Sequence, residues 1–340
     1  MPGLRNWIDP HGVPVRIYAE RWNGTLKNVV FAVRVAGMLI AERRKYQFVY
    51  FLMQGLHLAV GLPVARLLKK PIIMKIAGSG EVPRIYKSRI GQQELMWLNR
   101  WAKRVLVLNP GMRQEAIDHG ISAHKLEWMP NPVDTDEFSP ATPEKRREIR
   151  ARFGIPDCGQ VVLYSGRLAP EKGLETLLEA FALVLRQTPK ALLVLVGDGA
   201  MRGALTEQAV RLGLDESRVK FAGLVHPKEV CQWLKIADVF ALVSPAEGFS
   251  CALAEAMSTG VASVVSDIPA NRQLVEDGLQ GVLTPAGTAE SAASAIVGLL
   301  EDAPLRKRMG EMARLRILEN YSTEHIVERY EALFREALAD

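Results

Sequence analysis

Two short segments combine a glycine-containing turn with charged side chains, and both fall where an apolar run ends. In the first, Gly166 and Arg167 follow the run 161–165, and Lys172 comes just before a helical pattern that begins at Leu174. Two cations at the carboxyl end of a strand can hold a diphosphate, arginine with a planar fork of donors and lysine as a point charge. A surface loop with two solvated cations is the alternative, and this segment alone leaves it open.

The second segment places two glutamates around the start of a predicted helix. Glu247 precedes Gly248, Phe249 and Ser250, where the helix is expected to begin, and Glu255 lies further along it. Amides at a helix N-terminus bind anions. A carboxylate such as Glu255 can accept hydrogen bonds from the vicinal hydroxyls of a ribose. The alternative is an exposed helix glutamate, but its neighbours are apolar, and a buried carboxylate needs partners.

Short apolar runs alternate with helical patterns along most of the chain, and this order predicts an α/β fold with parallel sheets. Expected strands are 13–18, 48–53, 71–76, 104–108, 125–129, 161–165, 192–197, 219–221, 239–243 and 261–266. Expected helices between them include 91–103, 174–187, 201–212 and 228–236. The apolar stretch 29–41 is too short to span a bilayer. We interpret it as a buried helix, the alternative being a helix that faces a membrane.

A turn-rich stretch at 130–143 divides the chain into two predicted domains. We expect a shortened Rossmann-like domain at 1–140 and a second, ligand-binding one at 141–320. Residues 321–340 are expected to form a C-terminal helix that packs back on the N-terminal domain. Because ligands bind at the carboxyl ends of the strands in open α/β sheets, two doubly wound sheets would line a cleft from both sides.

The run Glu247–Gly260, continued through 261–267 and 271–275, resembles the nucleotide-sugar motif of retaining glycosyltransferases. The resemblance is closest to glycosyltransferase family 4, known as glycosyl transferases group 1, which has the GT-B fold. Four further segments agree with it in order, and together the matches cover about 105–330 well and 45–80 weakly. They are 166–173, 196–199, 219–224 with 237–239, and 131–134 before Phe138.

The resemblance implies a role for each candidate residue in a transfer from a nucleotide diphosphate sugar. UDP is the first choice of nucleotide and GDP the second. Arg167 and Lys172 would neutralise the donor diphosphate, Glu247 would hold hydroxyls of the sugar, and Glu255 would hold the ribose. The remaining donor contacts would come from Gly166, Val225, Gly248, Phe249 and Ser250. It also implies retention of configuration and no metal cofactor. The acceptor would be a glycan or a lipid-linked sugar in cell-envelope polysaccharide synthesis.

The match weakens in the first half of the chain. The usual opening strand, glycine-rich loop and helix of the family are missing, so we expect an N-terminal domain without its first βα unit, or a start other than Met1. A second copy or another chain would then cover the exposed edge. A histidine common in the family is replaced within Ala77–Glu81, which leaves Glu81 as the candidate general base. A non-catalytic or partner-dependent nucleotide-sugar-binding subunit is therefore the alternative function, and a sugar-nucleotide epimerase of the same architecture is a third.

Composition narrows the partners and the compartment. The net charge of +5 divides into +9 over residues 1–140 (20 Lys and Arg, 11 Asp and Glu) and −4 over residues 141–340 (23 and 27). The basic half could rest on an anionic membrane through 43–45, 69–70 and 84–89. Its aromatic residues do not interleave with these clusters, which argues against nucleic acid. Three scattered cysteines, Cys158 among them, and the lack of a signal pattern predict a cytoplasmic protein. The basic surface could place it on the inner face of the membrane as a peripheral protein. The literal D-x-D at 134–136 is read as a turn and not as a metal site.

Overall fold

The structure is a computed structural model of the 340-residue chain, and it describes residues 4–8, 14–18, 25–52, 55–157 and 159–339. The chain forms two compact units. Unit 1 comprises residues 1–107, 113–127 and 334–340, and unit 2 comprises residues 108–112 and 128–333. Each unit is an α/β layer structure, and each is described by itself.

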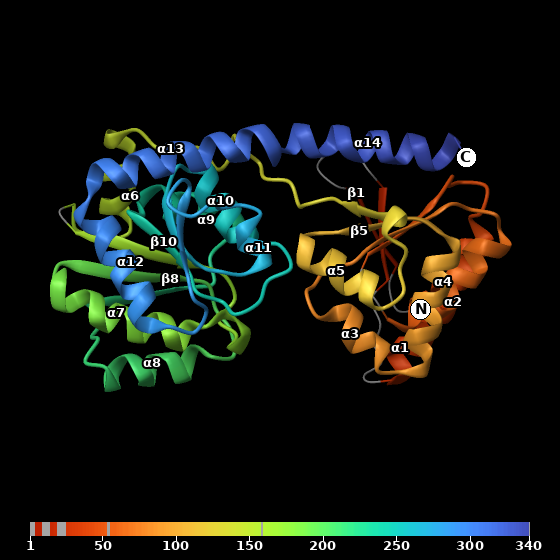
Figure 1. The fold of residues 1–340 in the computed structure, drawn as a ribbon, viewed down its shortest axis with the longest axis horizontal. Coiled ribbons are helices and arrows are strands. Elements are labelled where there is room, and N and C mark those ends of the chain that lie inside the picture. Colours follow the sequence, from red (N-terminus) through yellow and green to blue (C-terminus); the bar gives the residue numbers. More distant parts are fainter. Residues whose placement is uncertain (1–3, 9–13, 19–24, 53–54, 158, 340) are drawn as a thin grey trace. The chain divides into compact units, whose positions relative to one another are not determined.

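Unit 2 is built on a six-stranded parallel sheet with the strand order β12-β11-β10-β7-β8-β9 (Figure 1). Its central strands are continuous apolar runs that are buried along their whole length, as expected for strands covered by helices on both faces. The strands are β7 (Gln160–Ser165), β8 (Ala191–Val196), β9 (Val219–Gly223), β10 (Val239–Leu242), β11 (Ala262–Ser266) and β12 (Gly281–Thr284).

Helices connect these strands and cover the sheet of unit 2. The helices are α6 (Pro143–Arg152), α7 (Leu174–Gln187), α8 (Arg202–Arg211), α9 (Pro227–Ile236), α10 (Cys251–Ser258), α11 (Pro269–Arg272), α12 (Ala289–Glu301) and α13 (Ala303–Asn320), with a 3-10 turn, η2 (Pro170–Lys172), before α7. Since every crossover returns the chain to the same end of the sheet, the loops after β7, β8, β9 and β10 all lie at its carboxyl edge.

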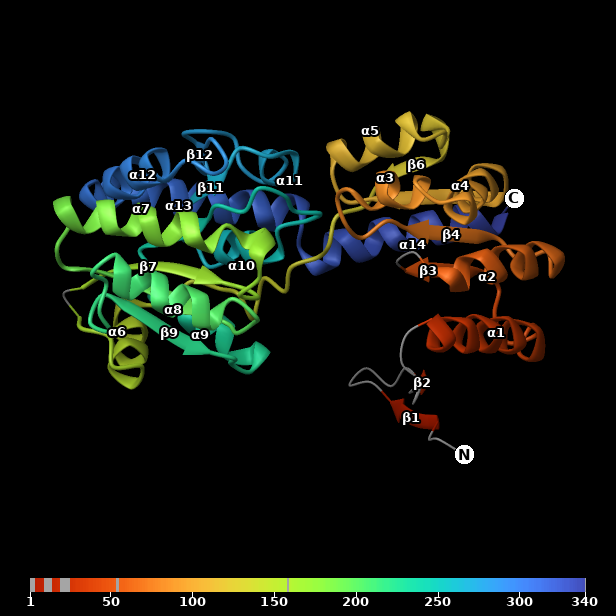
Figure 2. The same cartoon turned by 90° about the horizontal axis from the view of Figure 1, so that it is seen from below.

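Unit 1 contains a four-stranded sheet in the order β3-β4-β5-β6, flanked by helices (Figure 2). Strand β4, for example, has all four residues buried. The strands are β3 (Val49–Leu52), β4 (Ile72–Lys75), β5 (Ala102–Val107) and β6 (Leu126–Trp128), and the helical elements are α1 (Thr25–Ala41), α2 (Leu56–Leu67), α3 (Glu81–Tyr86), α4 (Arg89–Trp101), α5 (Pro110–Asp118) and η1 (Ala123–Lys125).

Two expectations for the start of the chain are corrected. The strand predicted at 13–18 is β2 (Pro14–Tyr18), which pairs antiparallel with β1 (Leu4–Ile8) in a separate two-stranded sheet. The helix predicted at 29–41 is part of α1, but it is not buried, because it packs against α2 through one face only. Ala32 and Leu39 are buried, whereas Val33 is 62% exposed. The helix carries apolar residues around most of its circumference, so the sequence pattern did not identify the face that packs against α2.

The turn-rich stretch at 130–143 belongs to unit 2, and the division falls before it, between Glu127 and Trp128. Backbone hydrogen bonds explain this placement, because Val133 donates to the carbonyl of Tyr321 and accepts from the amide of Thr323. The last helix, α14 (Thr323–Ala339), begins among unit 2 residues, and its residues from Phe334 onwards count with unit 1. There the Phe334 ring lies 4.7 Å from that of Phe48.

Most expected strands and helices are confirmed to within a few residues. The exception in unit 2 is β12, which was not predicted, because Gly281–Thr284 is short and follows a turn-rich segment. Among the described helices, none combines the length and the apolar character that crossing a bilayer requires. Cys158 lies outside the described residues, Cys231 is buried, and Cys251 is exposed.

Candidate donor site at the carboxyl edge of unit 2

The loop after β7 is held against its neighbours by backbone contacts that leave no room for side chains. Gly197 has φ = +134°, and a Cβ there would come within 2.0 Å of the carbonyl oxygen of Gly166. Gly173, at φ = +65°, would place a Cβ 2.6 Å from the carbonyl oxygen of Val243. Glycine is therefore required at both turns. This packing brings the loop that carries Arg167 and Lys172 against the residues that follow β10.

Lys172 and Glu247 form a largely buried ion pair at this junction. The Nζ of Lys172 lies 2.8 and 2.9 Å from the two carboxylate oxygens of Glu247, and the two side chains are 20% and 10% exposed. Ser244 donates to the same carboxylate at 2.9 Å. The structure thus joins two predicted site residues that are far apart in the sequence. It also adds Ser244, which the sequence did not single out.

Arg167 is the exposed cation of the same loop. Its guanidinium bonds to Glu171 at 2.5 Å, and the side chains are 69% and 50% exposed. The backbone below it is fixed, because the buried Tyr164 hydroxyl donates to the Arg167 carbonyl at 2.9 Å. Burial, and after it the charge of nearby Glu247, raises the pKa of Tyr164 and keeps the hydroxyl as a donor. Arg167 is therefore anchored at its main chain while its guanidinium faces solvent.

The segment before α10 presents backbone amides. Within the described residues, the N–H groups of Gly248, Phe249 and Ser250 have no hydrogen-bond acceptor. Amides of this kind at a helix start are suited to an anion. Two asparagines fix the segment from outside: Asn109 donates to the Gly248 carbonyl at 2.6 Å, and Asn271 accepts from the Ser250 hydroxyl at 2.6 Å. Only the fold reveals Asn109, because it lies far away in the sequence.

Glu255 differs from Glu247 in having no partner. It lies on α10, and no hydrogen bond or ion pair to its carboxylate occurs among the described residues. Burial, followed by repulsion from Glu137, raises the pKa of Glu255 to about 7. A buried carboxylate without donors is costly, so this side chain is ready to accept hydrogen bonds from a ligand. The predicted ribose contact agrees with that chemistry.

The other predicted positions divide into two groups. Gly166 lies at the same edge, and Val225 is half-buried in the loop between β9 and α9. Two further motif residues hold the fold together instead. Asp134 accepts the amides of Asp136 and Glu137 at 3.2 and 2.9 Å, which closes a turn. Asp238 bonds to Arg146 at 2.9 Å and to Arg150 at 2.8 Å, which ties α6 to the sheet.

Glu81, the candidate general base, lies in unit 1 at the N-terminus of α3. One carboxylate oxygen is buried and has no hydrogen-bond partner. The glycine-containing turn before it is bound by another acid, since Glu115 accepts from the Gly80 amide at 2.9 Å and from the Ser79 hydroxyl at 3.2 Å. Glu115 is a second carboxylate at this turn that sequence reasoning did not identify.

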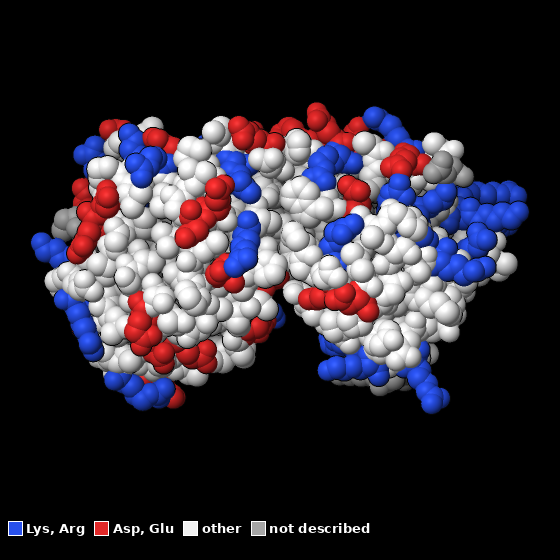
Figure 3. Space-filling model, in the orientation of Figure 1, with Lys and Arg blue, Asp and Glu red and all other residues white. Residues whose placement is uncertain are grey.

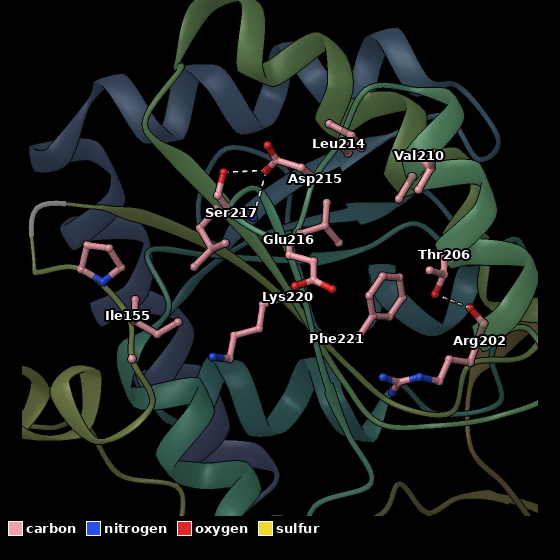
Figure 4. Close-up of a pocket in the computed structure, with 15 residues that line it drawn as sticks. Ile155, Arg202, Thr206, Val210, Leu214, Asp215, Glu216, Ser217, Lys220 and Phe221 are labelled. Atoms are coloured by element: carbon pink, nitrogen blue, oxygen red, sulfur yellow. Dashed lines mark hydrogen bonds between the residues drawn. The ribbon is translucent and has the colours of Figure 1, made fainter.

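A hollow of about 780 Å³ opens elsewhere on unit 2, beside the edge strand β9 (Figure 4). Figure 4 shows Phe221, a residue of β9, beside Arg202 at the start of α8, and the Arg202 guanidinium lies 5.5 Å from the Phe221 ring centre. None of the predicted donor residues lines this hollow. The donor site is therefore defined by the convergence of loops and charges and not by cavity size. Among the described residues, no group of three His, Cys, Asp or Glu side chains is placed to hold a metal ion.

Solved structures with the same fold are glycosyltransferases of the GT-B type. Anabaena HepE, solved with UDP and glucose, superimposes with a TM-score of 0.83 at 23% identity, covering 97% of this chain and 88% of that one. Sucrose-phosphate synthase from Thermosynechococcus elongatus gives a TM-score of 0.77 at 23% identity, covering 98% and 83%. At these identities the likeness shows the fold.

Residues 145–316 match the family model described as Glycosyl transferases group 1, and the chain belongs to this family. The alpha-D-kanosaminyltransferase of Streptomyces kanamyceticus is 29% identical over 285 residues, which is 80% of this chain and 72% of that protein. A D-inositol 3-phosphate glycosyltransferase of a Nocardioides species is 28% identical over 281 residues, 77% and 59%. The chain spans 50% to 72% of the length of four such relatives. The predicted family and enzyme class are confirmed, and the narrower assignment to family 4 stays a prediction.

Proposed function

We propose that the chain transfers a sugar from a UDP-sugar to a glycan or lipid-linked acceptor, with retention of configuration and without a metal ion. The observation that carries this proposal is the Lys172–Glu247 pair beside three amides that have no acceptor in the part of the chain that the structure describes. The pair combines a cation for phosphate with a carboxylate for sugar hydroxyls. The solved complexes of Anabaena HepE with UDP and with UDP-glucose support UDP as the nucleotide.

The chemistry follows from the charge that appears when the donor bond breaks. Cleaving the bond between the sugar and the diphosphate leaves UDP with growing negative charge. Arg167, Lys172 and the amides of 248–250 would stabilise that charge, and such preorganised groups lower the barrier. The cations take the part that a metal plays in other enzymes. Glu247 would then exchange part of its contact with Lys172 for hydroxyls of the donor sugar.

Binding is tested by thermal unfolding with UDP, GDP and other nucleotides, with and without an attached sugar. We expect UDP to raise the melting temperature of the wild type, and Glu255→Ala and Arg167→Ala to lose most of the shift. Arg211→Ala is a matched control, because Arg211 is 68% exposed and pairs with Glu207 one helical turn away, as Arg167 does with Glu171. If no nucleotide stabilises the chain, the donor-site assignment fails.

Catalysis is tested with the UDP-sugar that binds best. Slow hydrolysis of the UDP-sugar in the absence of acceptor supports an enzyme. Nuclear magnetic resonance of the first sugar product then determines its anomeric configuration. Binding without any release of UDP, also after a panel of glycan and lipid-linked acceptors is added, supports the nucleotide-sugar-binding subunit instead. Transfer that stops with a chelator and returns with a divalent cation contradicts the metal-free proposal.

A further inference from the structure

The amino-terminal edge of the unit 1 sheet carries a concentration of positive charge. Basic residues precede or begin each of β3, β4 and β5 and immediately precede β6, and because neighbouring strands are parallel, these segments meet at one edge. Together they hold ten cations against one acid, Glu42. The ten, called here the basic edge, are Arg43, Arg44, Lys45, Arg66, Lys69, Lys70, Arg100, Lys103, Arg104 and Lys125.

Contacts show that these segments form one surface. A hollow of about 520 Å³ is lined by five of these cations, so side chains from three of the four segments, those at β4, β5 and β6, converge. The five are Arg66, Arg100, Lys103, Arg104 and Lys125. On the β3 side, Lys70 bonds to the Tyr46 carbonyl at 2.6 Å, which links it to the turn that holds 43–45. Figure 3 shows Lys and Arg gathered at the right-hand end of unit 1.

The segments of the basic edge contain many more cations than acids, and an acidic side chain from elsewhere in unit 1 contacts one of them. Glu336 of α14 pairs with Arg104, and Glu42 lies 4.0 Å from Lys45. Burial, and then the positive charge of Lys103, lowers the pKa of Lys125. Like charges held this close repel one another, and an anion placed over them would relieve the repulsion.

Exposed aliphatic side chains lie among and beside the cations. Leu67, between Arg66 and Lys69, is 79% exposed, and Ile40, just before 43–45, is 47% exposed. Val33 continues this apolar surface along α1 at 62% exposure. Cations mixed with exposed aliphatic groups suit a lipid surface, where the charges meet phosphates and the apolar groups enter the headgroup region.

We propose that the basic edge, with Ile40 and Leu67, docks the protein on an anionic lipid bilayer. This goes beyond the transfer reaction, because it assigns a surface made of residues with no part in the donor site. A nucleic acid fits less well, since single-stranded bases stack on aromatic faces. The tryptophans nearest the edge, Trp97 and Trp101, already stack on each other at 5.2 Å.

A second basic cluster in unit 1 provides a matched control. Arg84, Lys87 and Arg89 lie in and just after α3, which follows β4, so they belong to the opposite, carboxyl edge of the same sheet. Changing these three residues to glutamate alters the net charge as much as Arg43→Glu/Arg44→Glu/Lys45→Glu does. The two triple variants therefore distinguish an effect of the position of the charge from an effect of the net charge.

The experiment measures co-sedimentation of the full chain with vesicles of phosphatidylcholine, with and without phosphatidylglycerol. We expect binding that needs phosphatidylglycerol and weakens with added salt. The triple change at 43–45 should lower the partition coefficient on the order of 100-fold, and the triple change at 84, 87 and 89 by less than about threefold. Leu67→Ser should weaken binding with no change in its salt dependence.

Three results would overturn the proposal: equal losses in both triple variants, binding unaffected by phosphatidylglycerol, or a preference for single-stranded RNA over the vesicles. Circular dichroism checks the folding of each variant. Should the change at 43–45 prevent folding, Arg66→Glu/Lys69→Glu tests the same edge from a different loop, since both side chains are exposed. Donor binding is read separately by the UDP-induced thermal shift, so failure of one proposal does not imply failure of the other.

Discussion

Two regions of this molecule concentrate positive charge, and they do so in opposite ways. At the carboxyl edge of unit 2, each cation faces a carboxylate: Lys172 is paired with Glu247 and Arg167 with Glu171. At the amino edge of unit 1, ten cations spread over four segments that contain one acid, Glu42. The first arrangement fixes the position of each charge, whereas the second supplies a broad positive potential.

The difference teaches what each region can recognise. A diphosphate must be held in one place while its bond breaks, and preorganised groups do this best. A bilayer has no single binding geometry, so its attraction depends on the number of cations near the surface. Variants that remove a charge fixed in one position should therefore change catalysis, and variants that remove part of the broad positive potential should change association.

The largest effect is expected for Lys172→Met. This change leaves the Glu247 carboxylate buried without its partner, and breaking such a pair costs about 3 kcal/mol of unfolding free energy. It also removes a charge from the leaving diphosphate, so UDP-sugar turnover should fall by at least 10²-fold. Urea unfolding and UDP release measure the two effects.

The double variant Lys172→Met/Glu247→Gln is the control for this prediction. It removes both charges, so we expect most of the lost stability to return while turnover stays low. Recovery of turnover together with stability would contradict the assignment, because the pair would then be structural only.

The second effect concerns Arg167→Ala, which should separate chemistry from stability. The Arg167–Glu171 pair is exposed, and exposed pairs contribute at most about 1 kcal/mol. Turnover should nevertheless fall on the order of 10²-fold, because the guanidinium would contact the diphosphate. Glu171→Gln keeps the cation, and its turnover should stay within a few-fold of the wild type. A matched loss in both variants would mean that the ion pair, and not the cation, is required.

How much of the fold and of the candidate site could be predicted from the sequence depends on whether the contacts are local in the sequence. The strands and helices of unit 2 could be predicted from continuous apolar runs and glycine turns. The loop at Gly166 and the loop before α10 were correctly identified as segments that follow strands. The pairing of Lys172 with Glu247 was not predictable from spacing, because it depends on the close approach of Gly173 to the Val243 carbonyl. Asn109 was missed for the same reason, since the fold alone brings it to Gly248.

The N-terminal region was predicted less well because its signals are ambiguous. Helix α1 carries apolar residues around most of its circumference, so the sequence did not show that Val33 is exposed. The run 13–18 has the composition of any strand, and its antiparallel partner at 4–8 carries no pattern of its own. Similarly, the basic clusters at 43–45 and 84–89 looked equivalent in sequence, and only the strand directions place them at opposite edges.

A smaller effect is expected for Glu255, the unpaired carboxylate of the donor site. Its pKa is raised to about 7 from 4.5, so the folded protein holds a proton that the unfolded chain releases between these values. The stability that this proton provides is complete below pH 4.5 and is lost as pH rises through 7, about 3 kcal/mol in total. Relative to wild type, Glu255→Gln should therefore gain stability between pH 5 and 8 in urea unfolding.

The same variant tests the ribose contact. Hydroxyls donate to the ionised carboxylate, so UDP binding should tighten as pH rises through 7 in the wild type but not in Glu255→Gln, which should bind UDP about tenfold more weakly at pH 8. Because both proteins meet the same nucleotide, titration of UDP itself cancels in the comparison. A parallel pH dependence in the two would show that Glu255 does not touch the ligand.

The smallest effect is expected when the basic edge is neutralised by Arg43→Gln/Arg44→Gln/Lys45→Gln. These side chains are exposed, and at physiological ionic strength the potential of an exposed charge is screened over about 8 Å. Donor binding depends on cations that are fixed by their own loops in unit 2, so the UDP dissociation constant should change by less than about twofold in calorimetry at 150 mM salt, a physiological ionic strength. At low salt the difference should grow, since screening weakens, and the two proteins should converge again as salt is restored. A tenfold loss of UDP affinity that persists at high salt would end the distinction between the two regions, because the edge would then contribute directly to the donor site.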